Sequence, residues 1–236
     1  MNLVLLEPAD FVSDTRARIG GRRREHVLSV LRAEVGDTLV VGRLDGPVGR
    51  GTIVAVDDQA LTLDVELDAA PPVALPVTLV LALPRPPVLR RVLIGVASLG
   101  VKRIVLVGAR AVEKSFWQSH AVEPDAVREQ LLLGLEQGCD TRLPEVVIRR
   151  RFKPFAEDDL PAMVDGVDAF VAHPTPELGR PERRAGRAAL LAIGPEGGWS
   201  DHELETLLLA GLRPISLGAR PLRVETAVPA LIARLM

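Results

Sequence analysis

The sequence predicts an α/β protein with a mostly parallel sheet, preceded by a smaller β-rich domain. From Val77 onward, short apolar runs typical of buried strands alternate with segments of helical periodicity, which is typical of a parallel sheet covered on both faces. Before residue 70, strand-like runs follow one another and are separated by glycine, aspartate and proline. The Pro-rich stretch AAPPVALP supplies a linker at 71–76, between a domain at 1–70 and one at 77–236.

The first domain is expected to contain short strands with one helix between them. Its strand-like runs are at 3–6, 38–42, 49–56 and 60–67. In RREHVLSVLRAEVGD, helical spacing relates Val27, Val30 and Leu31 before a turn at Gly36 and Asp37. Short strands at this spacing predict a small barrel.

The second domain is expected to alternate strands and helices along its whole length. Strands are predicted at 77–83, 103–108, 144–148, 168–173, 189–194 and 214–218. Helices are predicted at 88–99, 125–137, 155–163 and 225–235. The last of these places Val228, Leu231, Ile232 and Leu235 on one face, which predicts that this face packs on the sheet.

Composition excludes several classes of protein. With 47% apolar and 25% charged residues, the chain is typical of a globular protein rather than a disordered one. No apolar run reaches the roughly 20 residues that span a bilayer, and the N-terminus lacks a signal-peptide pattern, so we expect a cytoplasmic protein. One cysteine and four scattered histidines favour neither a disulfide framework nor a metal site. The net charge of −2 means that a nucleic acid would have to be bound by local basic patches.

Three consecutive predicted strands end in unusual loops: AHPTPELGR after the fourth, IGPEGGWS after the fifth and SLGARPLRVETA after the sixth. In open α/β sheets ligands bind at the carboxyl ends of strands. The middle loop matches neither the dinucleotide-binding nor the P-loop pattern, but its glycines let the backbone approach a ligand such as the polar edge of an adenine. The alternative is a tight strand-to-helix connection with a capping box formed by Ser200 and Glu203, and the two interpretations are compatible.

IGPEGGWSDHELE, SLGARPLRVETA and HVLSVLRAEVGD together resemble the 16S ribosomal RNA (uracil-N3) methyltransferases of the SPOUT superfamily. The resemblance covers most of the chain in the same order. It implies a SPOUT-type, mostly parallel sheet with a C-terminal deep trefoil knot, and a PUA-like N-terminal β-barrel that binds RNA. It also implies a homodimer that uses S-adenosyl-L-methionine to methylate N3 of a uridine in 16S rRNA of the small ribosomal subunit.

In that family S-adenosyl-L-methionine is held mainly by backbone groups of the three loops. Carried over motif by motif, the expected cofactor-binding residues are His173, Pro174, Ile193, Gly194, Glu196, Gly197, Gly198, Ser216, Leu217, Gly218, Leu222, Arg223, Thr226 and Ala227.

Methyl transfer to uracil N3 requires that the N3 proton be removed. The site should therefore supply a base, or cationic donors that stabilise the anion developing on O2 and O4. Arg223 and Arg220 are the candidates for the stabilising role, and Glu225 or Glu196 for proton acceptance. For Glu225 the alternative is structural, because a carboxylate in the first turn of a helix complements the helix dipole.

The chain departs from the family pattern at three places outside the loops. Glu136 and Gln137 match a Glu-Gln-x-x-Arg element, but Asp140 stands at the arginine position. A Glu-Leu-Gly-Val element reads SLGV, with Ser98 for glutamate, and a lysine after the first strand is absent, with Arg85 nearby. These changes leave two alternatives open: a SPOUT paralogue that methylates another RNA position, and a non-catalytic RNA-binding ribosome assembly factor.

Clusters of basic residues are the expected RNA contacts, because arginines bind phosphate oxygens. The first cluster surrounds a Gly-Gly pair and comprises Arg16, Arg18, Arg22, Arg23, Arg24, His26 and Arg32. RRRFK at 149–153 and GRPERRAGR at 179–187 are further patches. The alternative for each is solvated surface in an arginine-rich chain. Aromatic residues make up only 3% of the chain, which favours recognition of a folded RNA by shape over stacking on a single strand.

Overall fold

The computed structural model describes residues 2–174 and 186–236, which form two compact units. The first unit comprises the chain up to Val73 together with Leu131–Leu143. The second comprises Ala74–Gln130 and Pro144–Met236. The division near Val73 falls within the Pro-rich stretch, whereas the return of residues 131–143 to the first unit was not predicted.

The first unit is built on a six-stranded sheet of order β1-β4-β5-β6-β3-β2. β1 pairs in parallel with β4, and the other ladders are antiparallel. Its strands are β1 (Val4–Leu6), β2 (Phe11–Ser13), β3 (Arg16–Gly20), β4 (Thr38–Arg43), β5 (Val48–Val56) and β6 (Ala60–Ala69). Its helical segments are η1 (Pro8–Asp10), α1 (Gly21–Glu25) and η2 (His26–Val30). Strands are therefore confirmed near all the predicted positions, while β2 and β3 lie in a segment where none was expected.

Apolar side chains at alternate positions of the strands form the core of the first unit. Ala17 and Ile19 of β3 and Leu61 and Leu63 of β6 are fully buried, because residues two apart point to the same face of a sheet. The predicted apolar stripe of the helix is wrong beyond Val27. Val27 is buried, but Val30 is 64% exposed and Leu31 45% exposed. The physical reason is that the helix ends in a π turn at Val30, and Arg32 follows with a left-handed φ of 55°.

The C-terminal half of α3 (Pro124–Gly138) belongs to the first unit. Leu135 packs with Leu3 and Leu5, and the carbonyl of Glu136 accepts hydrogen bonds from the backbone N–H groups of Asn2 and Leu3, each at 3.0 Å. The Glu136 carboxylate, 2% exposed, accepts from Arg22 Nη2 at 2.8 Å. Burial raises the pKa of Glu136 above its ordinary value even though Arg22 opposes the shift.

The second unit contains a six-stranded, wholly parallel sheet of order β12-β10-β11-β7-β8-β9. Its strands are β7 (Leu75–Ala82), β8 (Val101–Val107), β9 (Glu145–Arg149), β10 (Asp168–Ala172), β11 (Ala189–Ile193) and β12 (Arg213–Ile215). Its helical segments besides the first half of α3 are α2 (Pro86–Ser98), η3 (Lys114–Gln118), η4 (His120–Val122), α4 (Phe152–Pro154), η5 (Phe155–Asp159), α5 (Leu160–Val164), α6 (Asp201–Leu209) and α7 (Val224–Leu235). The predicted α/β alternation and the mostly parallel sheet are confirmed.

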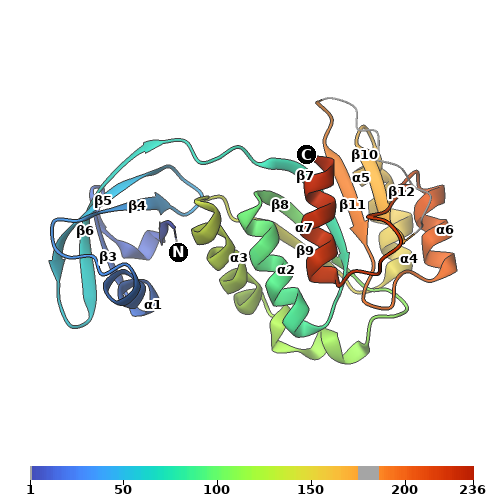
Figure 1. Cartoon of the computed structure of the whole chain (residues 1–236), viewed down its shortest axis with the longest axis horizontal. Coiled ribbons are helices and arrows are strands. Elements are labelled where there is room, and N and C mark those ends of the chain that lie inside the picture. Colours follow the sequence, from blue (N-terminus) through green and yellow to red (C-terminus); the bar gives the residue numbers. More distant parts are fainter. Residues whose placement is uncertain (1, 175–185) are drawn as a thin grey trace. The chain divides into compact units, whose positions relative to one another are not determined.

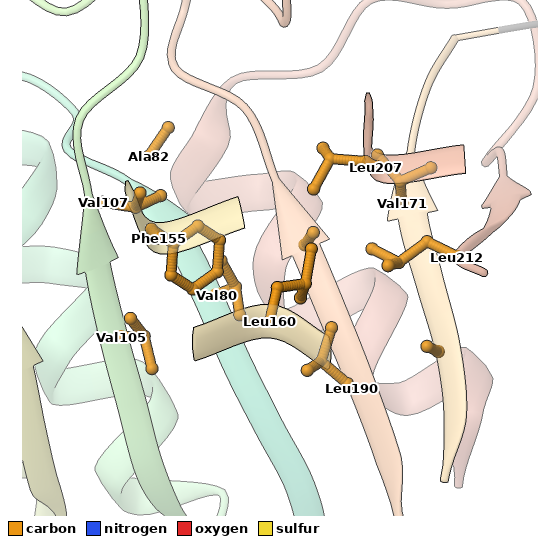
Figure 2. Packing of buried hydrophobic residues seen from close by; sticks show 12 residues of the cluster. Val80, Ala82, Val105, Val107, Phe155, Leu160, Val171, Leu190, Leu207 and Leu212 are labelled. Carbon is orange, nitrogen blue, oxygen red and sulfur yellow. The ribbon is translucent and has the colours of Figure 1, made fainter. Parts of the chain in front are cut away.

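Helices cover both faces of this sheet. Phe155, Leu160 and Leu207 pack with one set of alternating strand residues, and Figure 2 shows the Phe155 ring among Val80, Val105 and Val107. The intervening residues, such as Leu79 and Leu81, are also buried and point to the opposite face, where α2 and α7 lie side by side (Figure 1). Burying each such side chain contributes roughly 1.5–3 kcal/mol. The predicted stripe of α7 is confirmed, because all four of its residues are buried.

None of the helices in the described ranges is long and apolar enough to cross a lipid bilayer.

Candidate functional site

A cavity of about 390 Å³ lies at the carboxyl ends of β10, β11 and β12. The three loops singled out in the sequence converge on it. The first contributes His173 and Pro174, the second Gly194 to Trp199, and the third Ser216 to Gly218 and Arg220 to Leu222, while α7 adds Val224, Ala227 and Leu231. This is the edge of a parallel sheet at which ligands bind.

Backbone geometry explains the glycines of the middle loop. The N–H of Gly198 donates to the carbonyl of Pro195 at 2.8 Å, which closes a tight turn. Gly198 has a φ of 72°, a conformation that favours glycine. A Cβ on Gly194 would lie 3.1 Å from the backbone nitrogen of Trp199 and 3.2 Å from the carbonyl carbon of Gly198. A side chain at Gly194 would therefore press on the turn, and the residues of this turn line the cavity.

One hydrogen bond ties the start of the first loop to the end of β12, and another lies within the third loop. The His173 N–H donates to the carbonyl of Ile215 at 3.0 Å, which continues the pairing of β10 with β12. The Ser216 hydroxyl, in a residue only 3% exposed, accepts from the N–H of Gly218 at 3.0 Å. Gly218 has a φ of 103°. The first loop is therefore fastened to the end of β12, and the third loop turns back on itself at Ser216 and Gly218.

The carboxylates of Glu196, in the middle loop, and Glu203, in the first turn of α6, bind the loops that follow β7 and β8. Ser200 and Glu203 form the predicted capping box at the start of α6, with the Glu203 carboxylate accepting from the N–H and hydroxyl of Ser200 at 2.9 and 2.8 Å. Glu203 also accepts from the N–H of Arg110, in the loop after β8, at 2.7 Å. Glu196 accepts from the N–H of Arg85, in the loop after β7, at 3.1 Å. The sequence revealed the cap, but not the link to Arg110.

Nearly all the expected cofactor residues line this cavity. The exceptions are Arg223 and Thr226, which do not line it. Arg223 instead caps α7, and its carbonyl accepts from the N–H groups of Thr226 and Ala227 at 2.9 and 2.8 Å. Besides the candidate catalytic residue Arg220, the lining residues outside the expected set are Ala172, Pro195, Trp199, Ile215, Pro221, Val224 and Leu231. Pro195 and Trp199 lie within IGPEGGWS. Their position next to the expected glycines is the sequence signal that could have identified them as lining residues.

The candidate catalytic residues lie in different surroundings. Arg220 lines the cavity, and so does Glu196. Glu225 does not; its carboxylate forms an ion pair with Arg91 of α2 at 3.0 Å. The backbone N–H at the helix start, together with Arg91, holds the pKa of Glu225 below its ordinary value. This arrangement favours the structural interpretation of Glu225, since a depressed pKa makes a carboxylate a weaker proton acceptor.

Three arginines of the predicted RNA-binding cluster that are not buried pair with carboxylates or carbonyls of their own unit. Arg16 contacts Asp64 at 2.6 Å and Arg18 contacts Asp57 at 2.8 Å, and these side chains are about half exposed. Arg24 donates to the carbonyl of Asp57 at 2.6 Å. Because exposed ion pairs contribute little free energy, Arg16 and Arg18 can exchange their partners for phosphate.

The remaining residues of the cluster differ in burial. Arg23 is bound to Asp10 at 2.6 and 2.7 Å, and the two side chains are only 19% and 12% exposed. Arg22 is bound to the buried Glu136. Partial desolvation lowers the pKa of His26, which favours its neutral form. Arg32 is exposed at its left-handed position. Arg23 therefore stabilises the fold of the first unit, whereas Arg32 is exposed to solvent.

The Asp57 carboxylate should make stability depend on pH. The N–H groups of Gln59 and Ala60, then Arg18, lower the pKa of Asp57 to about 2. Because the folded-state value is depressed, its stabilising effect is present above the ordinary value of 3.8 and is lost as pH falls toward about 2. We expect Asp57→Asn to lower the melting temperature above pH 4, with a difference from the unsubstituted protein that shrinks between about pH 4 and 2. A difference that stays constant over this range would contradict the assignment.

The other basic patches have mixed surroundings. In the 149–153 segment, Arg149 is bound to Asp159 at 2.7 and 3.0 Å, and Lys153 lies 3.8 Å from Glu157. Arg150 lies over the ring of Trp117. The patch at 179–187 lies, up to residue 185, outside the described residues.

The three departures from the family pattern lie in separate places. Ser98 ends α2 and donates to the carbonyl of Gly95 at 2.8 Å. Asp140, 3% exposed, folds within the first unit and accepts from the N–H of Arg142 at 3.0 Å. Only Arg85 is tied to a residue that lines the cavity, Glu196. Across residues 2–174 and 186–236, no group of three histidine, cysteine or acidic side chains is arranged to hold a metal ion.

Comparison with known proteins identifies relatives along the whole chain. A family model described as an RNA methyltransferase domain matches residues 71–236. "Ribosomal RNA small subunit methyltransferase E" of Treponema pallidum (strain Nichols) is 30% identical over 239 residues, covering 99% of this chain and 90% of the relative. The protein of the same name from Synechocystis sp. is 27% identical, covering 87% of this chain and 68% of the relative.

Solved structures share the fold. The ribosomal RNA small subunit methyltransferase E of Neisseria gonorrhoeae, described as bound to S-adenosyl methionine, has a TM-score of 0.77 at 20% identity, covering 99% of this chain and 95% of that one. A putative methyltransferase of Legionella pneumophila, described as a complex with the same cofactor, has a TM-score of 0.76 at 21% identity, covering 99% and 96%. The chain thus belongs to the family of RNA methyltransferases that includes the ribosomal RNA small subunit methyltransferases E.

Proposed function

We propose that this chain is an S-adenosyl-L-methionine-dependent methyltransferase that modifies N3 of a uridine in 16S rRNA of the small ribosomal subunit. The observation that carries the proposal is the convergence of three strand-end loops, the middle one glycine-rich, on one cavity in a chain of this family. The relatives' names support a small-subunit RNA substrate. The bound cofactor named for the Neisseria and Legionella proteins supports the choice of methyl donor.

The cavity fits an adenosine-containing cofactor in size and chemistry. Its volume of about 390 Å³ falls within the range of roughly 300–1,000 Å³ that small-molecule sites occupy. Its lining offers backbone N–H and carbonyl groups beside apolar side chains. Trp199 also lines it, and its Nε1 is buried with no hydrogen-bond partner among the described residues. Leaving a buried donor unsatisfied costs about 1–3 kcal/mol, so a ligand acceptor that met it would be favoured.

S-adenosyl-L-methionine supplies an electrophilic methyl group on a sulfonium, and this chain supplies alignment and charge. The loop backbone holds the donor in position, which brings the two reactants together. Arg220 stabilises the negative charge that develops on uracil O2 or O4 as N3 loses its proton. Glu196, at the rim of the same cavity, accepts that proton. Arg223 acts through the start of α7, where it caps the helix.

Three further parts of the proposal concern architecture and setting. The return of α7 to α2 and β11, after β12 has passed outside β10, supports a trefoil knot at the C-terminus. The six-stranded mixed sheet of the first unit supports a PUA-like barrel that contacts RNA through Arg16, Arg18, Arg24 and Arg32. We also infer a homodimer, as the family resemblance implies, and a cytoplasmic location, as expected from the sequence.

Exchanging each glutamate for glutamine should separate the two candidate bases. We expect Glu196→Gln to reduce kcat by about 10²-fold or more and to flatten the acidic limb of the pH–rate profile, because the proton acceptor is lost. Glu225→Gln should keep kcat, while weakening the ion pair with Arg91. The measurement is kcat against pH for both variants. A loss of activity in Glu225→Gln with none in Glu196→Gln would reverse the assignment.

The cellular test is mass mapping of 16S rRNA from a strain that lacks this gene. We expect a 3-methyluridine to disappear from the small-subunit RNA and to return when the gene is restored. An unchanged 3-methyluridine signal would refute the proposed target. Loss of another modified nucleoside would identify a paralogue with a different RNA position.

A further inference from the structure

We propose that Trp117 and Arg150 form a stacking platform for an unpaired RNA base close to the base that is methylated. The inference rests on the proposed function, because it assigns a further part of the substrate to the surface beside the cofactor cavity. It also differs from the expectation that RNA is recognised without aromatic stacking.

Trp117 lies on a segment that is poor in buried side chains. η3 has the sequence KSFWQ, and none of its residues is buried although two of them are aromatic. The guanidinium of Arg150 lies over the Trp117 ring, 5.8 Å from its centroid, within the range of a cation–π contact. Arg150 itself is exposed. Trp117 is partly exposed, and together with the exposed Arg150 it places an aromatic ring beside a positive charge, which suits a nucleobase and its phosphate.

The platform lies at the same edge of the sheet as the cavity. η3 follows β8 and Arg150 follows β9, so both residues come after the carboxyl ends of their strands. β9 is three strands from β11 in the sheet order, which corresponds to roughly 14 Å at about 4.8 Å per strand. A few nucleotides of single-stranded RNA can cover this distance. A base stacked on Trp117 would therefore lie within a few nucleotides of the methylated uridine in the RNA sequence.

The two strand ends are fixed to each other and to the glycine-rich loop. The N–H of Gly108 donates to the carbonyl of Arg149 at 2.8 Å, and a Cβ on Gly108 would collide with the carbonyl oxygen of Arg150. A Cβ on Gly197 would lie 3.0 Å from Cβ of Ala111, in the loop that leads to η3. The hydrogen bond from Arg110 to Glu203 holds the same loop. The loop that leads to η3 is thus packed against the glycine-rich loop and bonded to the start of α6.

Charge around the platform is suited to a polyanion. Arg150 and Arg151 are exposed, and neither forms an ion pair within the described part of the chain. Arg149 is held by Asp159, which leaves its two neighbours as the cations open to phosphate. Two acidic residues lie close in sequence, Glu113 just before η3 and Glu157 a few residues after Arg151. The exposed positive charge is therefore confined to the segment that carries Arg150 and Arg151. Binding there should weaken as salt is added.

The test is steady-state methylation of purified small ribosomal subunits with labelled S-adenosyl-L-methionine. We expect Trp117→Ala to raise the KM for the subunit about tenfold or more, which is the effect of losing one stacked base. Trp117→Phe should restore most of the loss, because phenylalanine keeps an aromatic face. Arg150→Ala should raise the KM and make it less dependent on salt. All three variants should bind S-adenosyl-L-methionine as the unsubstituted protein does.

Arg103→Ala is the matched control. Arg103 lies in the N-terminal half of β8, its side chain is 53% exposed, and within the described residues its ion-pair contact is a long one, with Glu145 at 3.8 Å. Its loss removes the same charge without touching the platform, so the KM should not change. An unchanged KM in Trp117→Ala, or an equal rise in Trp117→Ala and Trp117→Phe, overturns the platform. If the unsubstituted protein fails to bind S-adenosyl-L-methionine, the proposed function fails instead, and the platform that rests on it falls with it.

Discussion

Replacing Gly194 with leucine should weaken S-adenosyl-L-methionine binding about 100-fold, or by ~2.7 kcal/mol. A Cβ at this position would already lie 3.1 Å from the backbone of Trp199 and 3.2 Å from that of Gly198. Backbone atoms cannot rotate away as a side chain can, so the turn must open and the cavity lining must shift. Isothermal titration calorimetry with S-adenosyl-L-methionine measures the effect.

Gly95→Ala is the matched control for this glycine substitution. Gly95 lies within α2, and a Cβ added to it would have no other heavy atom within 4 Å outside its own helix backbone. Its φ is not left-handed. Alanine is a better helix former, so this variant should be more stable by about 0.5–1 kcal/mol and should bind the cofactor normally. Normal cofactor binding by Gly194→Leu would refute the assignment of the glycine-rich loop.

Arg220→Ala should lower kcat by about 10²–10³-fold, as loss of a donor that stabilises developing negative charge does in other enzymes. Arg220 lines the cavity, is exposed and has no ion pair among the described residues, so its guanidinium is available to the uracil. Arg220→Lys should recover part of the rate, because lysine keeps the charge but not the planar fork of donors. Single-turnover methylation separates this effect from product release.

Cofactor affinity distinguishes this role from simple binding. We expect Arg220→Ala to bind S-adenosyl-L-methionine with nearly unchanged affinity. Arg90, exposed on α2, does not line the cavity, and Arg90→Ala should keep the full rate. An Arg220→Ala variant that retains kcat would remove Arg220 from the mechanism.

Periodicity predicted the second unit well because its elements have strong, simple patterns. The strands around Val80 and Leu190 are continuous apolar runs, and α7 carries an apolar stripe that packs as expected. The capping box at Ser200 was readable from residue types alone, because both partners lie within one turn of helix. The three loops were placed together by the rule that parallel strands end at one edge.

Local patterns could not reveal interactions between distant parts of the chain. β3 reads RARIG, in which only Ala17 and Ile19 face the core, so its apolar signal is two residues long. Helical periodicity places Leu135 on an apolar face but does not tell which unit that face packs against. The packing of residues 131–143 with Leu3 and Leu5 is therefore visible only in the tertiary structure. A helix that ends in a π turn similarly exposed Val30, which spacing alone had placed inside.

The arginine cluster shows why charge alone did not define the RNA contacts. Arg16 and Arg23 are the same residue type in the same cluster, but the ion pair of Arg16 is half exposed and that of Arg23 is largely buried. Removing one partner of a buried ion pair typically costs about 3–5 kcal/mol, so Arg23 serves the fold. The partners, Asp64 and Asp10, lie at unrelated sequence separations. Only tertiary pairing distinguishes an arginine open to phosphate from a structural one.

The most direct measurement is identification of the nucleoside that the chain modifies. Purified small ribosomal subunits from cells that lack the gene are incubated with the protein and S-adenosyl-L-methionine labelled in its methyl group, and the RNA is digested and analysed by mass spectrometry. We predict label in a single 3-methyluridine with the unsubstituted protein, and a strongly reduced amount with Gly194→Leu. Label in a different nucleoside, or no transfer by a protein that binds the cofactor, would contradict the proposed function.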